Sequence, residues 1–141
     1  SIYGKWKFYN SELIMAHFSK LDENNIVETV VVVNDEFAPT EAEGIQWLKD
    51  FYNEPHSVWI QTSYNTIGNT HILGGTPLRK NYGAKGFKYI SRIDAFVPEQ
   101  PYPSWTLNEE TGLWECPVER PDREDVIWNE DNQTWDIVTY E

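Results

Sequence analysis

Histidine and cysteine are the residues of this chain that most directly suggest metal binding or nucleophilic catalysis. The three histidines, His17, His56 and His71, are far apart, and none belongs to a His-Glu-x-x-His or Cys/His spacing that would hold zinc. The lone cysteine, Cys116, follows Glu115 directly. A neighbouring carboxylate disfavours the thiolate and so opposes its use as a nucleophile. The sequence therefore predicts no metal site and no cysteine-based catalysis.

Two other patterns suggest chemistry but lack an essential part of it. Segment 74–80, Gly-Gly-Thr-Pro-Leu-Arg-Lys, is similar to a phosphate-binding turn, but it lacks the Gly-Lys-Ser/Thr ending and Pro77 removes one backbone amide. Glu109 and Glu110 are adjacent, whereas glycoside hydrolysis needs two carboxylates facing each other across a cleft. We therefore expect a protein that is not an enzyme, with no catalytic residue and no cofactor.

Composition favours a folded domain with a large aromatic core. The chain has 141 residues, of which 15% are aromatic, including 7 Trp, 8 Tyr and 6 Phe. This length fits one domain, and this aromatic share is too high for a disordered acidic chain. No apolar run approaches the roughly 18 residues of a membrane span, and no secretion leader is visible in the sequence. We expect no membrane partner.

Charge is distributed unevenly along the chain. Residues 55–93 contain no Asp or Glu and five Lys or Arg, whereas residues 94–141 contain 13 acids and two Arg. The acidic last third would repel a polyanion, so the sequence predicts no nucleic-acid partner. Two interpretations of the basic segment stay open: its bases pair with acids nearby, or they meet the acidic segment of a neighbouring copy or partner.

The first half of the chain predicts a sheet with one helix on it. Segments 16–21 and 26–33 flank a polar turn and read as a hairpin, and the four consecutive valines 30–33 predict a strand covered on both faces at the centre of the sheet. Thr40-Glu-Ala-Glu43 is a capping box, and apolar residues follow it at helical spacing until Pro55. We expect a short helix at about 41–52, packed on a sheet face.

The C-terminal third predicts repeated hairpins. Segments 108–114 and 129–135 both begin with Asn-Glu and end with Trp, at an offset of 21 residues. Three apolar or aromatic pairs have the same spacing of seven residues: Tyr89 and Phe96, Leu107 and Trp114, and Trp128 and Trp135. An aromatic residue before a polar turn and another after it is typical of a hairpin, and cross-strand aromatic contacts at that spacing stabilise it.

These signals together predict an α+β, mainly β fold, in which an antiparallel sheet with one short helix is followed by C-terminal aromatic β-hairpins. Residues 1–14 are expected to be an N-terminal extension or arm, and 15–96 a β-rich body with the helix. Residues 97–141 are expected to be acidic, Trp-rich hairpin repeats. Because an isolated hairpin is marginal in water, these repeats should pack on the body or on a partner.

Aromatic and basic residues of the hairpins, the arm and the Gly-rich turn are the candidates for an interface. Exposed Trp and Tyr rings anchor protein interfaces and also stack on sugars, and the turn at 79–80 presents two bases. The interface candidates are Trp105, Trp114, Trp128, Trp135, Arg79, Lys80, Tyr82 and Trp6. The sequence leaves two functions open, a protein that contacts other proteins and a module that binds a glycan or host surface.

Several segments in this order resemble one group of small phage proteins. These segments are 15–27 (Met-Ala-His-Phe-Ser-Lys-Leu-Asp-Glu-Asn-Asn-Ile-Val), 59–65 (Trp-Ile-Gln-Thr-Ser-Tyr-Asn), 74–82 (Gly-Gly-Thr-Pro-Leu-Arg-Lys-Asn-Tyr), and 94–96 leading to 101–105 (Pro-Tyr-Pro-Ser-Trp). With the Asn-Glu…Trp hairpins, the chain resembles, over about 15–141, proteins encoded by marine tailed phages, notably phages of cyanobacteria.

The resemblance implies an accessory protein of the virion, such as a capsid decoration or a tail-associated subunit. Its expected partners are other phage structural proteins of the capsid or tail, with a homo-oligomer and a glycan as further candidates. It would be found in the virion, and in the host cytoplasm during assembly. The group's pattern lacks residues 1–14, and such an extension favours a virion arm.

Overall fold

The computed structural model describes residues 15–140. The expected arm 1–14, and with it Trp6, lies outside the described residues. The chain begins with an antiparallel sheet of β1 (Met15–Leu21), β2 (Val27–Asn34) and β3 (Val58–Thr62), in the order β2-β1-β3, and a helix, α3 (Glu41–Phe51), lies between β2 and β3 in sequence. The described residues form small antiparallel sheets with a single helix, which confirms the α+β, mainly β prediction.

The helix begins where the capping box predicted. The Thr40 side chain accepts a hydrogen bond from the Glu43 backbone N–H at 3.2 Å, and the Thr40 hydroxyl lies 3.2 Å from the Glu43 carboxylate. The helix packs on one face of the sheet through a cluster of buried residues, Ala16, Phe18, Val33, Ala38, Leu48 and Trp59. Phe18 at the middle of this cluster is fully buried. The predicted helix and its position on the sheet are confirmed.

The valine run lies at the edge of the sheet, so the prediction of a central strand is wrong. Strand β1 is central, and β2 pairs with it alone. The valines are nonetheless packed on both faces, because Val31 and Val33 belong to the cluster under α3 whereas Val30 packs with Leu21 and Phe96 on the opposite face. A continuous apolar run thus reports burial of both faces, which an edge strand also has when a layer covers each side.

The second face of the sheet is covered by short strands and turns of residues 66–97. These are β4 (Thr66–Ile67), β5 (Thr70–His71), β6 (Lys88–Ile90), the 3-10 turn η1 (Ser91–Ile93) and β7 (Ala95–Val97). The backbone of Gly83 comes so close that an added Cβ would lie 2.5 Å from the Phe96 ring and 2.6 Å from Ser19 Oγ. Ser19 Oγ donates to the Gly83 carbonyl at 2.7 Å, which fixes this layer on β1.

Three hairpins share one geometry, as the seven-residue spacing predicted. They are β6–β7, β8 (Thr106–Asn108) with β9 (Leu113–Glu115), and β10 (Val126–Asn129) with β11 (Thr134–Ile137). Cross-strand partners are Tyr89 and Phe96, Leu107 and Trp114, and Trp128 and Trp135. In each turn the fifth residue after the first partner has a positive φ: Asp94 (48°), Gly112 (69°) and Gln133 (52°).

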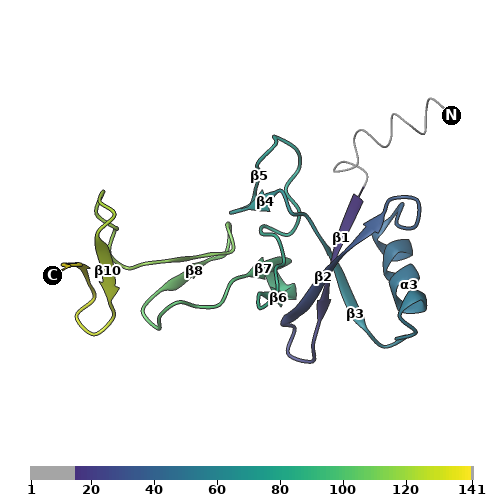
Figure 1. The fold of residues 1–141 in the computed structure, drawn as a ribbon, viewed down its shortest axis with the longest axis horizontal. Helices are drawn as coiled ribbons and strands as arrows, with labels where there is room; N and C mark the ends of the chain where they lie inside the picture. The colour runs from purple at the N-terminus through teal and green to yellow at the C-terminus, as the bar shows by residue number, and fades with distance from the viewer. Residues whose placement is uncertain (1–14, 141) are drawn as a thin grey trace.

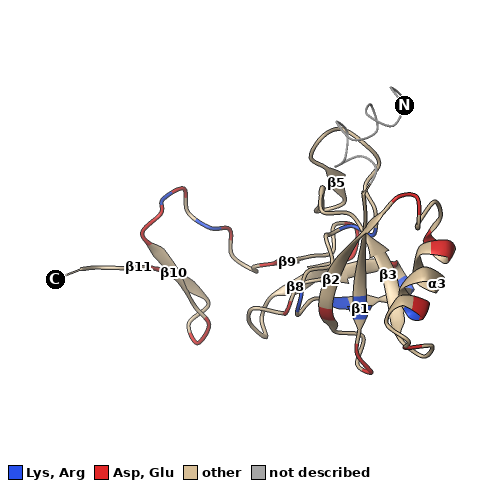
Figure 2. Ribbon diagram, turned by 45° about the vertical axis from the view of Figure 1, so that its right-hand side comes forward, with Lys and Arg blue, Asp and Glu red and all other residues tan. Residues whose placement is uncertain are grey.

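The hairpins extend the molecule away from the sheet. Figure 1 shows the sheet and α3 at one end, β4–β5 and β6–β7 beside them, and then β8–β9 and β10–β11 reaching toward the C-terminus. Acidic residues gather on the hairpin turns and the connector before β10, and also on α3 (Figure 2). Within residues 15–140, no helix has the length and apolar character needed to cross a membrane.

Gly44 tests how closely α3 is packed on the sheet. A Cβ at this position would clash with the Phe18 ring and lie 2.8 Å from the Ala38 Cβ. Gly44→Ala would gain about 1 kcal/mol in helix propensity, but overpacking of a filled core costs about 1–3 kcal/mol. We expect net destabilisation, measured by urea unfolding. Gln46→Ala, at an exposed position of the same helix, is the control and should leave stability nearly unchanged; a stabilised Gly44→Ala would contradict the close packing.

Candidate functional site

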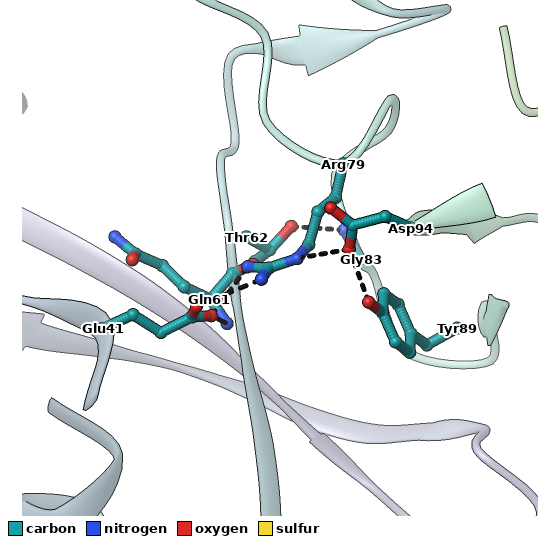
Figure 3. A network of polar contacts seen from close by, with 7 residues as sticks. All are labelled: Glu41, Gln61, Thr62, Arg79, Gly83, Tyr89 and Asp94. Carbon is teal, nitrogen blue, oxygen red and sulfur yellow. Dashed lines mark hydrogen bonds and ion pairs between the residues drawn. The ribbon is translucent and has the colours of Figure 1, made fainter. Parts of the chain in front are cut away.

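Arg79 lies at the junction of the helix, the sheet edge and the β6–β7 turn (Figure 3). Its guanidinium donates to both Glu41 carboxylate oxygens, at 2.7 and 3.1 Å, and to the Gln61 carbonyl at 2.8 Å. Its Nε donates to Asp94 Oδ1 at 2.9 Å. Glu41 in turn accepts from the Gln61 backbone N–H at 2.8 Å. Both backbone groups of Gln61 on the outer edge of β3 are therefore satisfied by side chains.

Two groups of this network, Arg79 and Asp94, favour their ionised states. Burial disfavours the charged form of Arg79, but its hydrogen bonds to Glu41 and Asp94 outweigh burial and raise its pKa above the ordinary value. Burial likewise acts to raise the pKa of Asp94, yet hydrogen bonds from Tyr89 and Arg79 lower it overall. A depressed folded-state pKa stabilises the fold at neutral pH, and this contribution is lost as the pH falls through that pKa. Arg79, an interface candidate from the sequence, thus has its partners within this chain.

Lys80 and Asn81 attach the β8–β9 turn to the body. The Lys80 ammonium donates to the Glu109 carbonyl, and the Arg92 guanidinium binds the Glu109 carboxylate. Asn81 is buried, with 2% of its surface exposed, and its Nδ2 lies 2.9–3.1 Å from three carbonyls, those of Phe96, Thr111 and Gly112. These contacts join segments that are up to 31 residues apart. The Lys80 and Asn81 side chains of the basic turn therefore bind carbonyl groups of this same chain.

Tyr82, the remaining candidate of the Gly-rich segment, lies beside an apolar cavity. The cavity has a volume of about 370 Å³ and lies between the β4–β5 turn and the β8–β9 hairpin; its lining includes Tyr64, Ile67, Ile72, Tyr82, Phe87 and Leu113. Tyr82 packs edge-on against Tyr64 and His17, with ring centroids 6.2 Å apart in both pairs. Burial raises the pKa of Tyr82 and lowers that of His17, so both side chains favour their neutral forms.

Two hairpin tryptophans fasten their strands to the preceding connector in the same way. Trp114 Nε1 donates to the Pro98 carbonyl at 2.7 Å, and Trp135 Nε1 donates to the Val118 carbonyl at 2.8 Å. The two donors are related by the 21-residue repeat, and their acceptors lie 16 and 17 residues upstream. The repeat therefore includes a tertiary contact as well as a turn.

A cluster of indoles holds the last hairpin in place. Trp105 packs against Trp128 and Trp135 at centroid distances of 6.3 and 6.4 Å, and Trp128 lies 5.3 Å from Trp135. Glu130 accepts from Trp128 Nε1 at 2.8 Å and from the Ser104 hydroxyl at 2.6 Å, and these bonds, that of Ser104 first, lower the pKa of Glu130. The cluster turns its indoles toward each other, and Trp128 is only 6% exposed.

Exposed apolar side chains lie on both faces of this hairpin. Ile127 lies opposite Asp136, whereas Ile137 is two residues from Trp135 and shares the face of the indole cluster. Ile127 and Ile137 are 57% and 53% exposed, and Tyr140 is 88% exposed. Val118 on the adjoining connector is 41% exposed. We call these four residues the tip surface. Three exposed acids, Asp122, Glu124 and Asp131, lie near these residues in the sequence.

No family model, curated protein or solved structure matches this chain. Its function is therefore argued from its own geometry. Within residues 15–140, no group of three or more His, Cys, Asp and Glu side chains is arranged to hold a metal ion.

The sequence did not predict the structural roles of residues whose partners lie far away along the chain. Glu41 reads as an ordinary first-turn acid, but it seals the edge of β3 from 20 residues away. Asn81 reads as a loop residue, but it links three carbonyls. The exposed Ile67 and Ile72 beside the cavity stand in a stretch rich in turn residues, where nothing distinguishes them. No local pattern in the sequence signals any of these roles.

The Arg79 network makes a first prediction for this site. Arg79→Ala removes several charge-assisted hydrogen bonds and reopens the edge of β3, so we expect a loss of about 2–3 kcal/mol in the free energy of unfolding. Arg79→Lys should recover only part of it, because one ammonium cannot bridge the same acceptors. The measurement is chemical denaturation at pH 7. Arg92→Ala, which breaks an exposed pair with Glu109, is the control and should have a much smaller effect; equal losses would contradict the structural role of Arg79.

The hydrogen bonds of the Asn81 amide give a second prediction for this site. Asn81→Asp has nearly the same shape but places acceptors against three carbonyls, so it should destabilise more than the roughly 1–3 kcal/mol of an unsatisfied group. The loss should be smaller at pH 4 than at pH 7, because a protonated carboxyl regains one donor. Urea unfolding at both pH values measures this. Asn69→Asp, at an exposed position of the neighbouring turn, is the control; a loss at Asn81 that does not depend on pH would contradict the proposed donor role.

Proposed function

We propose that this chain is a non-enzymatic structural protein of a phage particle, a capsid decoration or tail-associated subunit that acts through protein–protein contacts. The observation that carries the contact function is the tip surface, a set of exposed apolar side chains on both faces of the hairpin that extends farthest from the body. Packing of a partner protein around this hairpin would remove the apolar area of these side chains from water. The phage setting is supported by the sequence resemblance alone.

The C-terminal hairpins β8–β9 and β10–β11 are fastened by contacts that hold the tip surface in a fixed position. Trp114 and Trp135 each bind a carbonyl of the preceding connector, and Trp105 packs on the last hairpin. Prolines in the connectors restrict them further. A pre-ordered contact loses less conformational entropy on binding than a mobile one, so a modest apolar area supports useful affinity. In a multi-copy particle, repeated attachment strengthens such contacts by avidity.

The charge around the tip surface specifies the kind of protein it fits. The acids Asp122, Glu124 and Asp131, which lie near it in the sequence, are exposed. A partner surface with an apolar centre and a rim of Lys or Arg would match it, and such complementarity guides encounter and orientation.

The glycan-binding alternative depends on exposed indoles. The buried Trp128 and the inward-facing cluster favour a structural role for these rings. The alternative remains open for other aromatic side chains, of which Tyr64 is 63% exposed beside the cavity.

The proposal predicts that the protein is present in purified particles. We expect mass spectrometry to detect it there at a copy number consistent with a repeated site. The variant Ile127→Ser should keep its circular dichroism spectrum but lower incorporation several-fold, because it removes exposed apolar area on the face of the hairpin opposite the indole cluster. Thr134→Ser on the same hairpin is the matched control. Absence from particles would refute the virion role, and a shift of Trp fluorescence on adding host-surface polysaccharide would favour the glycan alternative.

A further inference from the structure

The two edge strands of the sheet differ in how many of their outward backbone groups have hydrogen-bond partners. On β3, the backbone groups of Gln61 are bound by Glu41 and Arg79, so at this residue they are not free to pair with another strand. On β2, only the start is covered: Val27 donates to the Phe87 carbonyl at 2.8 Å and accepts from the Gly86 N–H at 2.9 Å. Beyond Val27, none of the described residues pairs with the outer side of the strand.

The strand register shows which backbone groups are open. Because Gln61 points its N–H and C=O away from β1, its neighbours Ile60 and Thr62 point toward β1, where their partners are Ser19 and His17. The intervening residues of β1 therefore point toward β2.

On β2, this alternation gives inward and outward groups. Phe18 of β1 faces Val31, so Val31 bonds to β1. Val30 and Val32 then direct their N–H and C=O groups away from the sheet. The outward direction of Val27, across the register shift at the end of β1, agrees with this assignment.

Over residues 30–33, beyond Glu28 and the register shift, this edge lacks the features that keep natural edges from pairing. Strand β2 reads Val-Glu-Thr-Val-Val-Val-Val-Asn, without Lys or Pro. Val32 is 52% exposed although it is apolar. Edges of soluble proteins usually carry charges, prolines or a covering segment, because open apolar edges recruit further strands.

We propose that β2 pairs with β2 of a second copy of this chain, in antiparallel register about a two-fold axis at Val31, to form a continuous six-stranded sheet. In this register Val30 of each copy faces Val32 of the other. The N–H and C=O groups of Val30 and Val32 in each copy then meet those of Val32 and Val30 in its partner, which gives four hydrogen bonds. This inference concerns a different surface from the tip surface and does not depend on the proposed virion function.

Charge supports this occupant and this register. With Val31 on the axis, Glu28 faces Asn34 of the other copy, so no like charges lie directly opposite each other along the strand. A register centred on Val30 pairs Val32 with Glu28, which lies at the register shift of the strand. A register centred on Val32 pairs Val30 with Asn34, whose carbonyl already accepts from the Phe37 N–H, and it places Glu28 opposite Glu36 of the other copy. The symmetric contact is closed, so it produces a dimer and not a fibre.

The first test is the mass of the full chain in solution, by light scattering and sedimentation. We expect a concentration-dependent dimer. Val32→Pro removes an outward N–H that bonds to none of residues 15–140, so it should give a folded monomer, as proline is tolerated at sheet edges. Val32→Thr keeps the N–H and is the matched control, expected to stay dimeric. Val32→Lys is a second disrupting variant in case Val32→Pro fails to fold.

The second test reads the register. In a Cys116→Ser background, Val31→Cys should form an intermolecular disulfide under mild oxidation, because directly opposed residues of a non-hydrogen-bonded pair have Cα atoms about 4.5 Å apart. Val32→Cys faces Val30 of the other copy and should not. A wild-type monomer at all concentrations, a dimer that survives Val32→Pro, or a chain that dimerises only after residues 1–14 are removed would each overturn the proposal.

Discussion

The closure of the β3 edge by Glu41 and Arg79 is the interaction on which the rest of the body depends. A three-stranded sheet has one central strand and two edge strands. A large share of its backbone N–H and C=O groups therefore has no partner within the sheet. Arg79 satisfies those of Gln61 while tying the start of α3 to Asp94 in the β6–β7 turn. The Arg79 side chain thus ties together both layers that cover the sheet. The second layer leads into the C-terminal hairpins.

The backbone at this junction violates a local preference. Arg79 and the next residue, Lys80, both have left-handed φ angles, 53° and 67°, which cost about 1–2 kcal/mol per non-glycine residue. The bend aims the Arg79 guanidinium at the sheet edge and presents its carbonyl to the Phe96 N–H at 3.1 Å. Ion pairs and hydrogen bonds from three elements offset that local cost, so the conformation exists only in the assembled fold.

Sequence patterns predicted the parts of this fold that depend on neighbours in the chain. The capping box placed α3 at about 41–52 against the observed Glu41–Phe51, and the seven-residue spacing gave all three cross-strand pairs. Strand order was missed, because a valine run indicates coverage of both faces and says nothing about neighbours on either edge. The roles of Arg79 and Asn81 were missed for the same reason, since their partners lie 15 to 38 residues away.

The C-terminal hairpins β8–β9 and β10–β11 are held mainly by contacts between consecutive segments, whereas the body is held by contacts between distant ones. Each Trp clamp joins a hairpin to the connector just before it, so the hairpins follow one another as nearly one-dimensional units. In such an array a change at the outermost unit affects its neighbour and little else. The tip surface can therefore be altered without disturbing the sheet, whereas the sheet edges are governed by Arg79 on one side and the valines of β2 on the other. The chain thus presents two surfaces whose contacts are physically independent.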